Sequence, residues 1–357
     1  MASRITNYQC PACTGPLHFG AQSGLLECDY CGSKFEVQEI EALYKDKDES
    51  AAKQDHAQQA KTAQTPDNTW DAFQGYVCPS CGAELVCDDT TAATSCPYCG
   101  NPSIVPGKLD DMQKPDYVLP FRMNRQQAVE ALKKYYKGKK LLPSSFSKDN
   151  HIEEIKGVYV PFWLYDGETD ADVHFHATRV HSHIQGDYEV TVTDHFRVHR
   201  AGTVAYSRLP VDASSKMPDA HMDAIEPFDY SELTEFSTAY LPGYYAEKYD
   251  EDAEKCSARA NERAKNTALN AMQDSVMGFS SCVVETSDVQ VHSHNAKYAL
   301  MPVWMLSTKW QGKNYLFAMN GQTGKLIGDL PISKGKLLAW FAGICVPLWA
   351  IFAMVIH

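Results

Sequence analysis

Two cysteine quartets with one shared spacing constrain this chain of 357 residues more than any other feature. Each quartet consists of two Cys-x-x-Cys pairs with fourteen residues between them. A Cys-x-x-Cys turn directs two sulfurs toward one point, and two such turns on facing hairpins complete a tetrahedral site of four thiolates. The spacing therefore predicts two zinc ribbons, each with one Zn²⁺ ion. The predicted ligands are Cys10, Cys13, Cys28 and Cys31 in the first ribbon, and Cys78, Cys81, Cys96 and Cys99 in the second.

A redox role is the competing interpretation of the last pair. Cys96-Pro97-Tyr98-Cys99 resembles a dithiol motif whose reactive thiol lies at the start of a helix. Gly100-Asn101-Pro102 follows at once and prevents a helix, so metal binding is favoured. Because all four ligands of each site are protein sulfurs, no coordination position stays open for water. Both zinc ions are therefore expected to be structural and not catalytic.

The charge of the whole chain bears on its partners. The formal net charge is −12 and the sequence pI is near 5.5, which is the wrong sign for a protein that binds phosphate backbones. Nucleic acid is therefore not the expected partner. Twelve cysteines, eight of them at metal-binding spacing, fit a reducing cytoplasm. The first residues, Met-Ala-Ser-Arg-Ile-Thr, lack the apolar stretch of a secretory signal peptide.

The C-terminal segment predicts a membrane anchor. Leu337 to Ile356 contains no charged residue, and its length matches the hydrocarbon thickness of a bilayer. Three lysines precede this segment and only a histidine follows it, so the positive-inside rule places the preceding bulk of the chain in the cytoplasm. A buried terminal helix of a soluble domain is the alternative. We expect a tail-anchored, single-pass protein of the cell membrane, in contact with the lipid bilayer.

Composition divides the chain into five segments. The predicted fold class is two small zinc ribbons followed by an α+β, largely antiparallel β domain and one C-terminal transmembrane helix. The boundaries are residues 1–38 for ribbon 1, 39–74 for a flexible or weakly helical linker, 75–107 for ribbon 2, 115–330 for the cytoplasmic α+β domain and 337–356 for the transmembrane helix.

Two helices are predicted in the α+β domain. Asn124 can cap a helix that continues to about Lys137 and ends at Gly138. The longest helical pattern extends over residues 250–277, with a stripe of small side chains at Ala260, Ala264 and Ala268.

No catalytic pattern is recognisable in the sequence. Gly321-Gln322-Thr323-Gly324-Lys325-Leu326 lacks the GxxxxGK[ST] spacing of a phosphate-binding loop, and no helix pattern follows it. We therefore predict that the protein is not an enzyme and has no catalytic or cofactor-binding residues other than the metal ligands.

A histidine-rich β-hairpin lies within residues 173–206. A two-residue turn at Gly186-Asp187 places His174 opposite His199 and His176 opposite Arg197, with His195 on the same face. Such a face can bind a metal or sense pH. The pattern indicates no carboxylate or cysteine at ligand spacing beside these histidines, so a solvated sheet face is favoured.

Several longer strings resemble a known bacterial family. They are the tandem CPxC ribbons, GVYVPFWLYD, VDASSKMPDAHMDAIEPFDYSEL, FSTAYLPGYYAEKYD and NYLFAMNGQTGKLIGDLPISKGK. Together they resemble membrane-anchored proteins with TFIIB-type zinc ribbons, often labelled primosomal protein N′ or replication-restart helicase-like. The chain lacks a Walker motif and a helicase core, so the resemblance does not extend to helicase activity. It implies zinc ligation by the eight cysteines and a component of complexes with SPFH (flotillin-like) or phage-shock proteins.

Three functions remain in competition. The favoured one is a non-enzymatic, membrane-anchored zinc-ribbon adaptor that recruits or assembles cytoplasmic proteins at the membrane, in a membrane-stress complex. The second is a membrane-tethered nucleic-acid-binding factor, which the acidic balance and the lack of a basic stripe near the ribbons disfavour. The third is a metalloenzyme or hydrolase at the histidine face.

Overall fold

The structure is a computed structural model that describes residues 8–44, 74–87, 96–100, 105–106, 113–149 and 152–356. Most of the predicted linker (45–73) and the tip of the predicted second ribbon (88–95) lie outside the described residues. The chain forms two compact units. The first comprises 1–161, 215–248 and 300–357, and the second 162–214 and 249–299.

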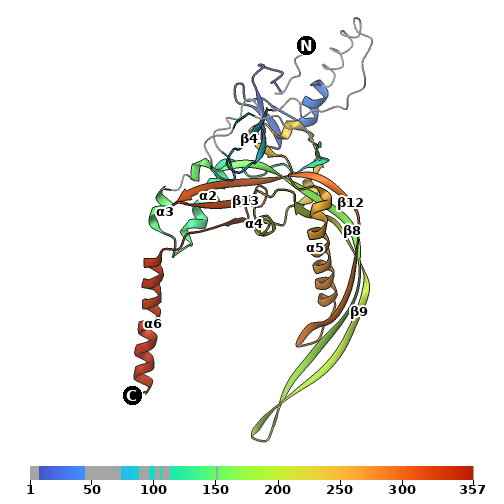
Figure 1. Cartoon of the computed structure of the whole chain (residues 1–357), viewed down its shortest axis with the longest axis vertical. Coiled ribbons are helices and arrows are strands. Elements are labelled where there is room, and N and C mark those ends of the chain that lie inside the picture. The colour runs from blue at the N-terminus through green and yellow to red at the C-terminus, as the bar shows by residue number, and fades with distance from the viewer. Residues whose placement is uncertain are drawn as a thin grey trace. The chain divides into compact units, whose positions relative to one another are not determined.

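The first cysteine quartet belongs to a three-stranded antiparallel sheet, which we call ribbon 1 (Figure 1). Its strands are β1 (Leu17–Gly20), β2 (Leu25–Cys28) and β3 (Lys34–Phe35), and residues 37–44 are helical. Leu17, Phe19 and Leu26 are buried in this small sheet. So few apolar side chains cannot offset the entropy of ordering the segment, which is why the cysteines matter for its stability.

The second quartet belongs to a group of strands that we call ribbon 2. These strands are part of the large sheet of the first unit. Its strands are β4 (Gln74–Val77), β5 (Glu84–Cys87) and β6 (Val105–Pro106). β5 pairs antiparallel with β11 (Tyr245–Glu247), and β11 pairs parallel with β8 (Lys156–Gln185). Backbone hydrogen bonds therefore join ribbon 2 directly to the body of the unit.

The remaining elements of the first unit are further strands of the same sheet and several helices. They are β7 (Tyr117–Val118), α2 (Arg125–Lys137), α3 (Ser144–Asp149), η2 (Ile152–Glu154), α4 (Asp219–Ile225), η3 (Tyr230–Glu232), β10 (Thr234–Glu235), η4 (Thr238–Tyr240), β13 (Lys313–Asn320) and β14 (Leu326–Gly328). The path through the sheet is β10-β7-β12-β8-β11-β5-β4-β6, and β13 extends it from β12 (Ser281–Trp310).

The predicted start of α2 is confirmed. The Asn124 side chain accepts a hydrogen bond from the Gln127 backbone N–H at 2.9 Å, and the Gln127 side chain accepts one from the Asn124 N–H at 3.0 Å. This reciprocal capping box satisfies two donors that a helix N-terminus otherwise leaves unpaired.

An aromatic cluster fills the core of the first unit. Phe121 stacks on Tyr244 with ring centroids 4.2 Å apart, and it contacts Tyr159 and Trp304 edge-on at 5.0 and 5.3 Å. A Cβ at Gly157 would lie 2.5 Å from the Tyr244 ring, so the strand can approach this cluster only with glycine there.

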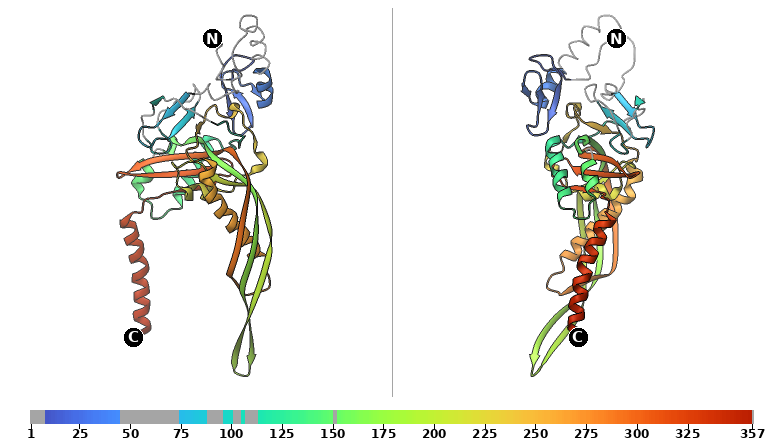
Figure 2. Two further views of the ribbon diagram at one scale, coloured as in Figure 1. Left: turned by 45° about the vertical axis from the view of Figure 1, so that its right-hand side comes forward. Right: turned by 90° about the vertical axis from the view of Figure 1, so that its left-hand side faces the viewer.

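The second unit is built on the hairpin of β8 with β9 (Tyr188–Asp212), together with β12 and α5 (Ala253–Asp274) (Figures 1 and 2). Figure 1 shows α5 along the concave side of the curved strands. Val173 and Phe175 of β8 are fully buried and belong to one cluster with Ala268 of α5. The predicted stripe of small side chains is confirmed as buried, and it lets the helix lie close to the sheet.

The predicted transmembrane helix over 337–356 requires a correction. α6 (Lys334–Ile356) covers this segment, but no helix in the described part of the chain is long and apolar enough to cross a membrane. Its first turn is polar, since Lys336 donates a hydrogen bond to the Leu142 carbonyl at 2.6 Å. The predicted fold class is wrong in this element, as are the tail anchor, the single-pass location in the cell membrane and the cytoplasmic orientation derived from it.

Asn320 provides a test of the packing in the first unit. Its buried side chain donates to the carbonyls of Ile225 and Pro227 at 3.0 and 3.1 Å, and accepts from the backbone N–H of Gln322 and Thr323 at 2.9 and 3.0 Å. Asn320→Asp keeps the shape but turns a carboxylate oxygen toward two carbonyls. We expect the free energy of unfolding to fall by about 3 kcal/mol.

The matched control is Asn314→Asp, at an exposed position of the same strand. Its urea midpoint should equal that of the unchanged protein. Equal midpoints for the two variants would contradict the assigned role of Asn320.

Candidate metal centres

All four Cys-x-x-Cys segments adopt one backbone turn. In each, the N–H four residues after the first cysteine donates to the carbonyl of that cysteine, at distances of 2.8–3.0 Å. The donating residues are Thr14, Gly32, Gly82 and Gly100, with φ values of 61°, 73°, 71° and 68°. A positive φ favours glycine, which explains its presence in three of the four turns. The turn that the spacing predicts at each Cys-x-x-Cys pair is thus confirmed.

The turns bring the sulfurs of each quartet together. In ribbon 1 the Sγ atoms of Cys10 and Cys31 are 3.5 Å apart and those of Cys13 and Cys28 are 3.4 Å apart. In ribbon 2 the corresponding distances are 3.6 Å for Cys78–Cys99 and 3.7 Å for Cys81–Cys96. Within each quartet all four Sγ atoms lie within 4.8 Å of one another. A Zn–S bond of about 2.3 Å gives an edge of roughly 3.8 Å in a regular tetrahedron, so each quartet has the dimensions of a four-thiolate metal site.

Protonation differs among these sulfurs. Hydrogen bonding to the Ser33 side chain, and then to its backbone, lowers the pKa of Cys31 to about 6. Burial raises the pKa of Cys81 to about 11 and raises that of Cys96 further. A metal ion that binds the second quartet must therefore displace protons from Cys81 and Cys96.

Each ribbon has a tyrosine at the same position of its second turn, but the two tyrosines differ in their contacts. Tyr98, between the cysteines of the last pair in ribbon 2, is only 5% exposed, and its hydroxyl donates to the buried carboxylate of Glu247 in β11. Tyr30 holds the same position in ribbon 1 and is 78% exposed. Ribbon 1 instead contacts the segment around η4 through Phe19, whose ring centroid lies 4.9 Å from that of Tyr240. The second turn of ribbon 1 is thus a free protein surface where ribbon 2 has an internal contact.

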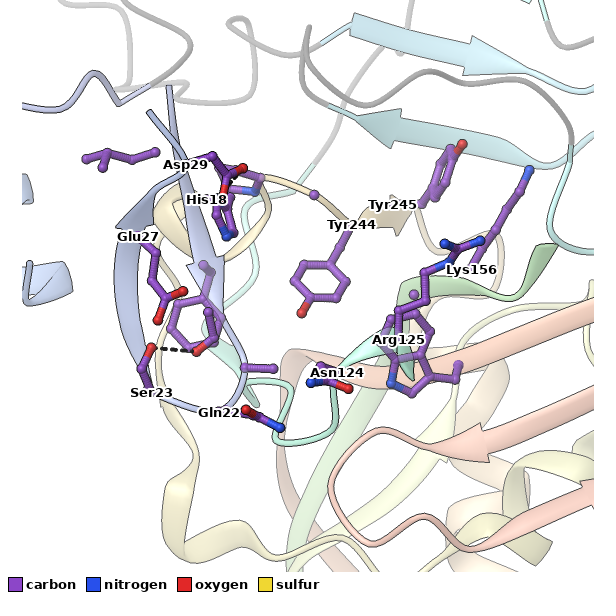
Figure 3. A pocket seen from close by; sticks show the side chains of 18 of the residues that line it. His18, Gln22, Ser23, Glu27, Asp29, Asn124, Arg125, Lys156, Tyr244 and Tyr245 are labelled. Carbon is purple, nitrogen blue, oxygen red and sulfur yellow. Dashed lines mark hydrogen bonds and ion pairs between the residues drawn. The ribbon is translucent and has the colours of Figure 1, made fainter. Parts of the chain in front are cut away.

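A cavity of about 980 Å³ lies beside ribbon 1 in the first unit (Figure 3). Figure 3 shows Glu27, Asp29 and His18 of the ribbon on one side and Arg125 and Lys156 on the other. Acidic and basic groups thus face the same space, and its charge selects neither an anionic nor a cationic small molecule. We assign no ligand to it.

The histidine face lies on the β8–β9 hairpin of the second unit. His174 is opposite His199, and His176 is opposite Arg197, which confirms the predicted register. The His174 and His199 rings stack with centroids 4.5 Å apart, and His176 Nε2 lies 3.0 Å from His195 Nδ1.

One prediction about this face is wrong. The histidine pattern indicates no carboxylate at ligand spacing, but Asp172 Oδ1 lies 2.9 Å from His199 Nε2. Asp172 precedes His174 by two residues on the same strand and therefore lies on the same face. The two-residue period of a strand is the sequence signal that places Asp172 beside the histidines.

Removal of the Tyr98 hydroxyl tests the contact between Tyr98 and Glu247. Tyr98→Phe removes a hydroxyl that donates to a buried carboxylate, so we expect the free energy of unfolding to fall by about 1–3 kcal/mol. Tyr30→Phe is the matched control, and its exposed hydroxyl should contribute less than about 0.5 kcal/mol. Denaturant unfolding of both variants measures the difference. A Tyr98→Phe variant as stable as the control would show that the contact does not stabilise ribbon 2.

Comparison with known proteins gives one relative of almost equal length. No family model and no solved structure matches the chain, so its resemblance to TFIIB-type zinc-ribbon proteins stays a prediction. The chain is 37% identical over 343 residues to a protein of Bacillus subtilis (strain 168) named "Uncharacterized protein YdjG". The match covers 95% of this chain and 94% of that protein. The chain therefore belongs to the same family as YdjG.

Proposed function

We propose that this protein is a non-enzymatic zinc-ribbon adaptor that binds another protein through ribbon 1. The observation that carries the proposal is the difference between Tyr30, which is exposed, and Tyr98, which is bound to Glu247. In ribbon 2 this position attaches the ribbon to β11. In ribbon 1 the same kind of turn offers its tyrosine to a partner, and tyrosine is enriched where proteins bind one another.

The sulfur geometry supports structural zinc at both quartets. Four thiolates are the preferred ligands of a structural Zn²⁺ ion, and four protein ligands leave no open position for a substrate or water. Zinc then replaces the apolar core that each ribbon lacks, and metal binding is coupled to folding. The ribbons act as rigid surfaces and catalyse no reaction.

The charge of ribbon 1 defines the chemistry of the partner. Residues 8–44 contain five carboxylate side chains and one lysine, Lys34, which lies 2.7 Å from Glu27. Asp29, which directly precedes Tyr30, is exposed, and so are Glu36 and Glu39 of the same segment. Such a surface repels a phosphate backbone and attracts lysine and arginine. The partner is a protein with a basic patch and a hydrogen-bond acceptor for the Tyr30 hydroxyl. The resemblance noted above suggests SPFH (flotillin-like) or phage-shock proteins.

Metal analysis tests the structural zinc. After gel filtration with a weak chelator, which removes loosely bound ions, the full chain should carry two zinc ions. Cys10→Ser and Cys78→Ser should each lower this number to one, because three sulfurs bind zinc far more weakly than four. The control is Cys345→Ser, at an exposed cysteine of α6 outside both quartets. Two zinc ions retained by both ribbon variants would contradict the proposed sites.

Comparative affinity capture tests the adaptor. Full-length protein and its Tyr30→Ala variant are captured from the cells that express them, and the bound proteins are quantified by mass spectrometry. A partner of ribbon 1 should fall at least tenfold with Tyr30→Ala and on raising the salt concentration, since the contact is partly ionic. The variant should keep both zinc ions, because Tyr30 is not a ligand.

Tyr188→Ala is the matched control, since Tyr188 is 77% exposed but lies on the β8–β9 hairpin. Its captured proteins should equal those of the unchanged chain. An equal loss in both tyrosine variants would refute the assignment to ribbon 1. Nucleic acid retained through ribbon 1 would replace the adaptor by the nucleic-acid-binding alternative.

A further inference from the structure

The β8–β9 hairpin holds a second kind of metal-ligating cluster, remote in sequence from the cysteines. Asp172 and His174 of β8 and His199 of β9 lie on the exposed face of the second unit. The alternate residues Val173 and Phe175 are fully buried against α5. A slip of one residue would expose them, so the core fixes which side chains share the outer face. The cluster is therefore held by the register of the hairpin.

The distances within this cluster suit one ion. Asp172 Oδ1 lies 2.9 Å from His199 Nε2 and 3.7 Å from His174 Nδ1. The two imidazole rings are nearly parallel, with an angle of 23° between their planes, and one ligand atom from each residue lies within 4.8 Å of the others. An ion with bonds of about 2.0–2.2 Å to nitrogen and oxygen can contact all three after small side-chain rotations.

The surroundings also favour a cation. A surface hollow of about 290 Å³ lies beside the cluster and is lined by Asp170, Asp172 and Asp288. Two arginines lie near the cluster. The guanidinium of Arg197 pairs with Glu285 at 3.0 Å. Arg200, the residue after His199, donates to the His199 carbonyl at 2.9 Å and to the Ser275 side chain at 3.1 Å. The three carboxylates that line the hollow attract cations.

We propose that Asp172, His174 and His199 form a surface site for one divalent transition-metal ion. Two imidazoles and one carboxylate select zinc, nickel or copper over magnesium and calcium, which prefer oxygen ligands alone. Three protein ligands leave coordination positions to water, and the side chains are about half exposed. The ion therefore exchanges with solvent, in contrast to an ion enclosed by four cysteines.

The neighbouring histidines do not belong to this site. His176 and His195 stack two residues further along the hairpin, with ring centroids 5.1 Å apart. The described residues place no carboxylate with this pair at metal-ligand distances, whereas Asp172 completes the first group. Substitution of one histidine in each group therefore shows which group binds the metal ion.

Nickel titration of the full-length, zinc-loaded protein without a histidine tag tests the proposal. Calorimetry measures Ni²⁺ binding, and elemental analysis of the same samples counts nickel and zinc. We expect one nickel ion per chain with the zinc content unchanged. Asp172→Asn and His174→Gln should each weaken the dissociation constant at least tenfold, because each removes one of three ligands.

Two control variants make the assignment specific. His183→Gln removes a histidine nearer the hairpin turn, and His176→Gln removes one of the neighbouring pair; both should bind nickel within threefold of the unchanged protein. Thermal unfolding should show that all four variants remain folded. The proposal is overturned if no nickel binds at millimolar concentration. It is also overturned if nickel only displaces zinc, or if His176→Gln weakens binding as much as His174→Gln.

Discussion

The pairing of β8 is the constraint on which the rest of the structure depends. β8 forms backbone hydrogen bonds with β9, β11 and β12, and β11 in turn carries ribbon 2. From Val158 to Tyr165 every side chain of β8 is buried. From Asp166 to Ala177 buried residues alternate with more exposed ones, and from Arg179 to Gln185 all are exposed. A strand covered on both faces needs a continuous apolar run, and a strand with one solvated face needs alternation. One part of β8 is thus covered on both faces, and another part has one buried and one solvated face. The exposed histidines lie on the solvated face.

Features determined by near neighbours in the chain were predictable from the sequence. The four cysteine turns, the cap at Asn124 and the Gly186-Asp187 turn depend on contacts within a few residues, and the structure has them where the pattern indicated. Once the hairpin turn is known, the opposite pairs from Gln185 and Tyr188 to Gly167 and Tyr206 follow from counting. Between Gly167 and Tyr165 the register shifts, and no counting from the turn predicts this. The cysteine sites were predictable because the spacing of ligands is itself the signal.

Features that depend on distant residues were not predictable in this way. Tyr98 and Glu247 are separated by 149 positions, and nothing near either one indicates the other. The parallel pairing of β11 with β8 likewise has no local signature. The C-terminal segment differs from these cases, because its uncharged run predicted a membrane-spanning helix. The described helices include none that is long and apolar enough to cross a membrane. Asp172 is predictable from the strand period, because it precedes His174 by two residues and so lies on the same face.

The two kinds of metal-ligating cluster in this chain differ in a way that follows from how each is built. The quartet of ribbon 1 lies in a three-stranded sheet whose apolar core is too small to be stable alone, so an ion bound there would be part of the fold. The Asp172 cluster lies on a hairpin whose core already fixes its geometry, so the fold does not depend on an ion there. Soft sulfur ligands in a closed site retain zinc, whereas two imidazoles and a carboxylate at an open surface bind it weakly and exchange it. Zinc would thus occupy the ribbons first, and only metal in excess of that demand would reach the hairpin. Occupancy of the hairpin would then report the supply of free metal without altering the fold of the chain.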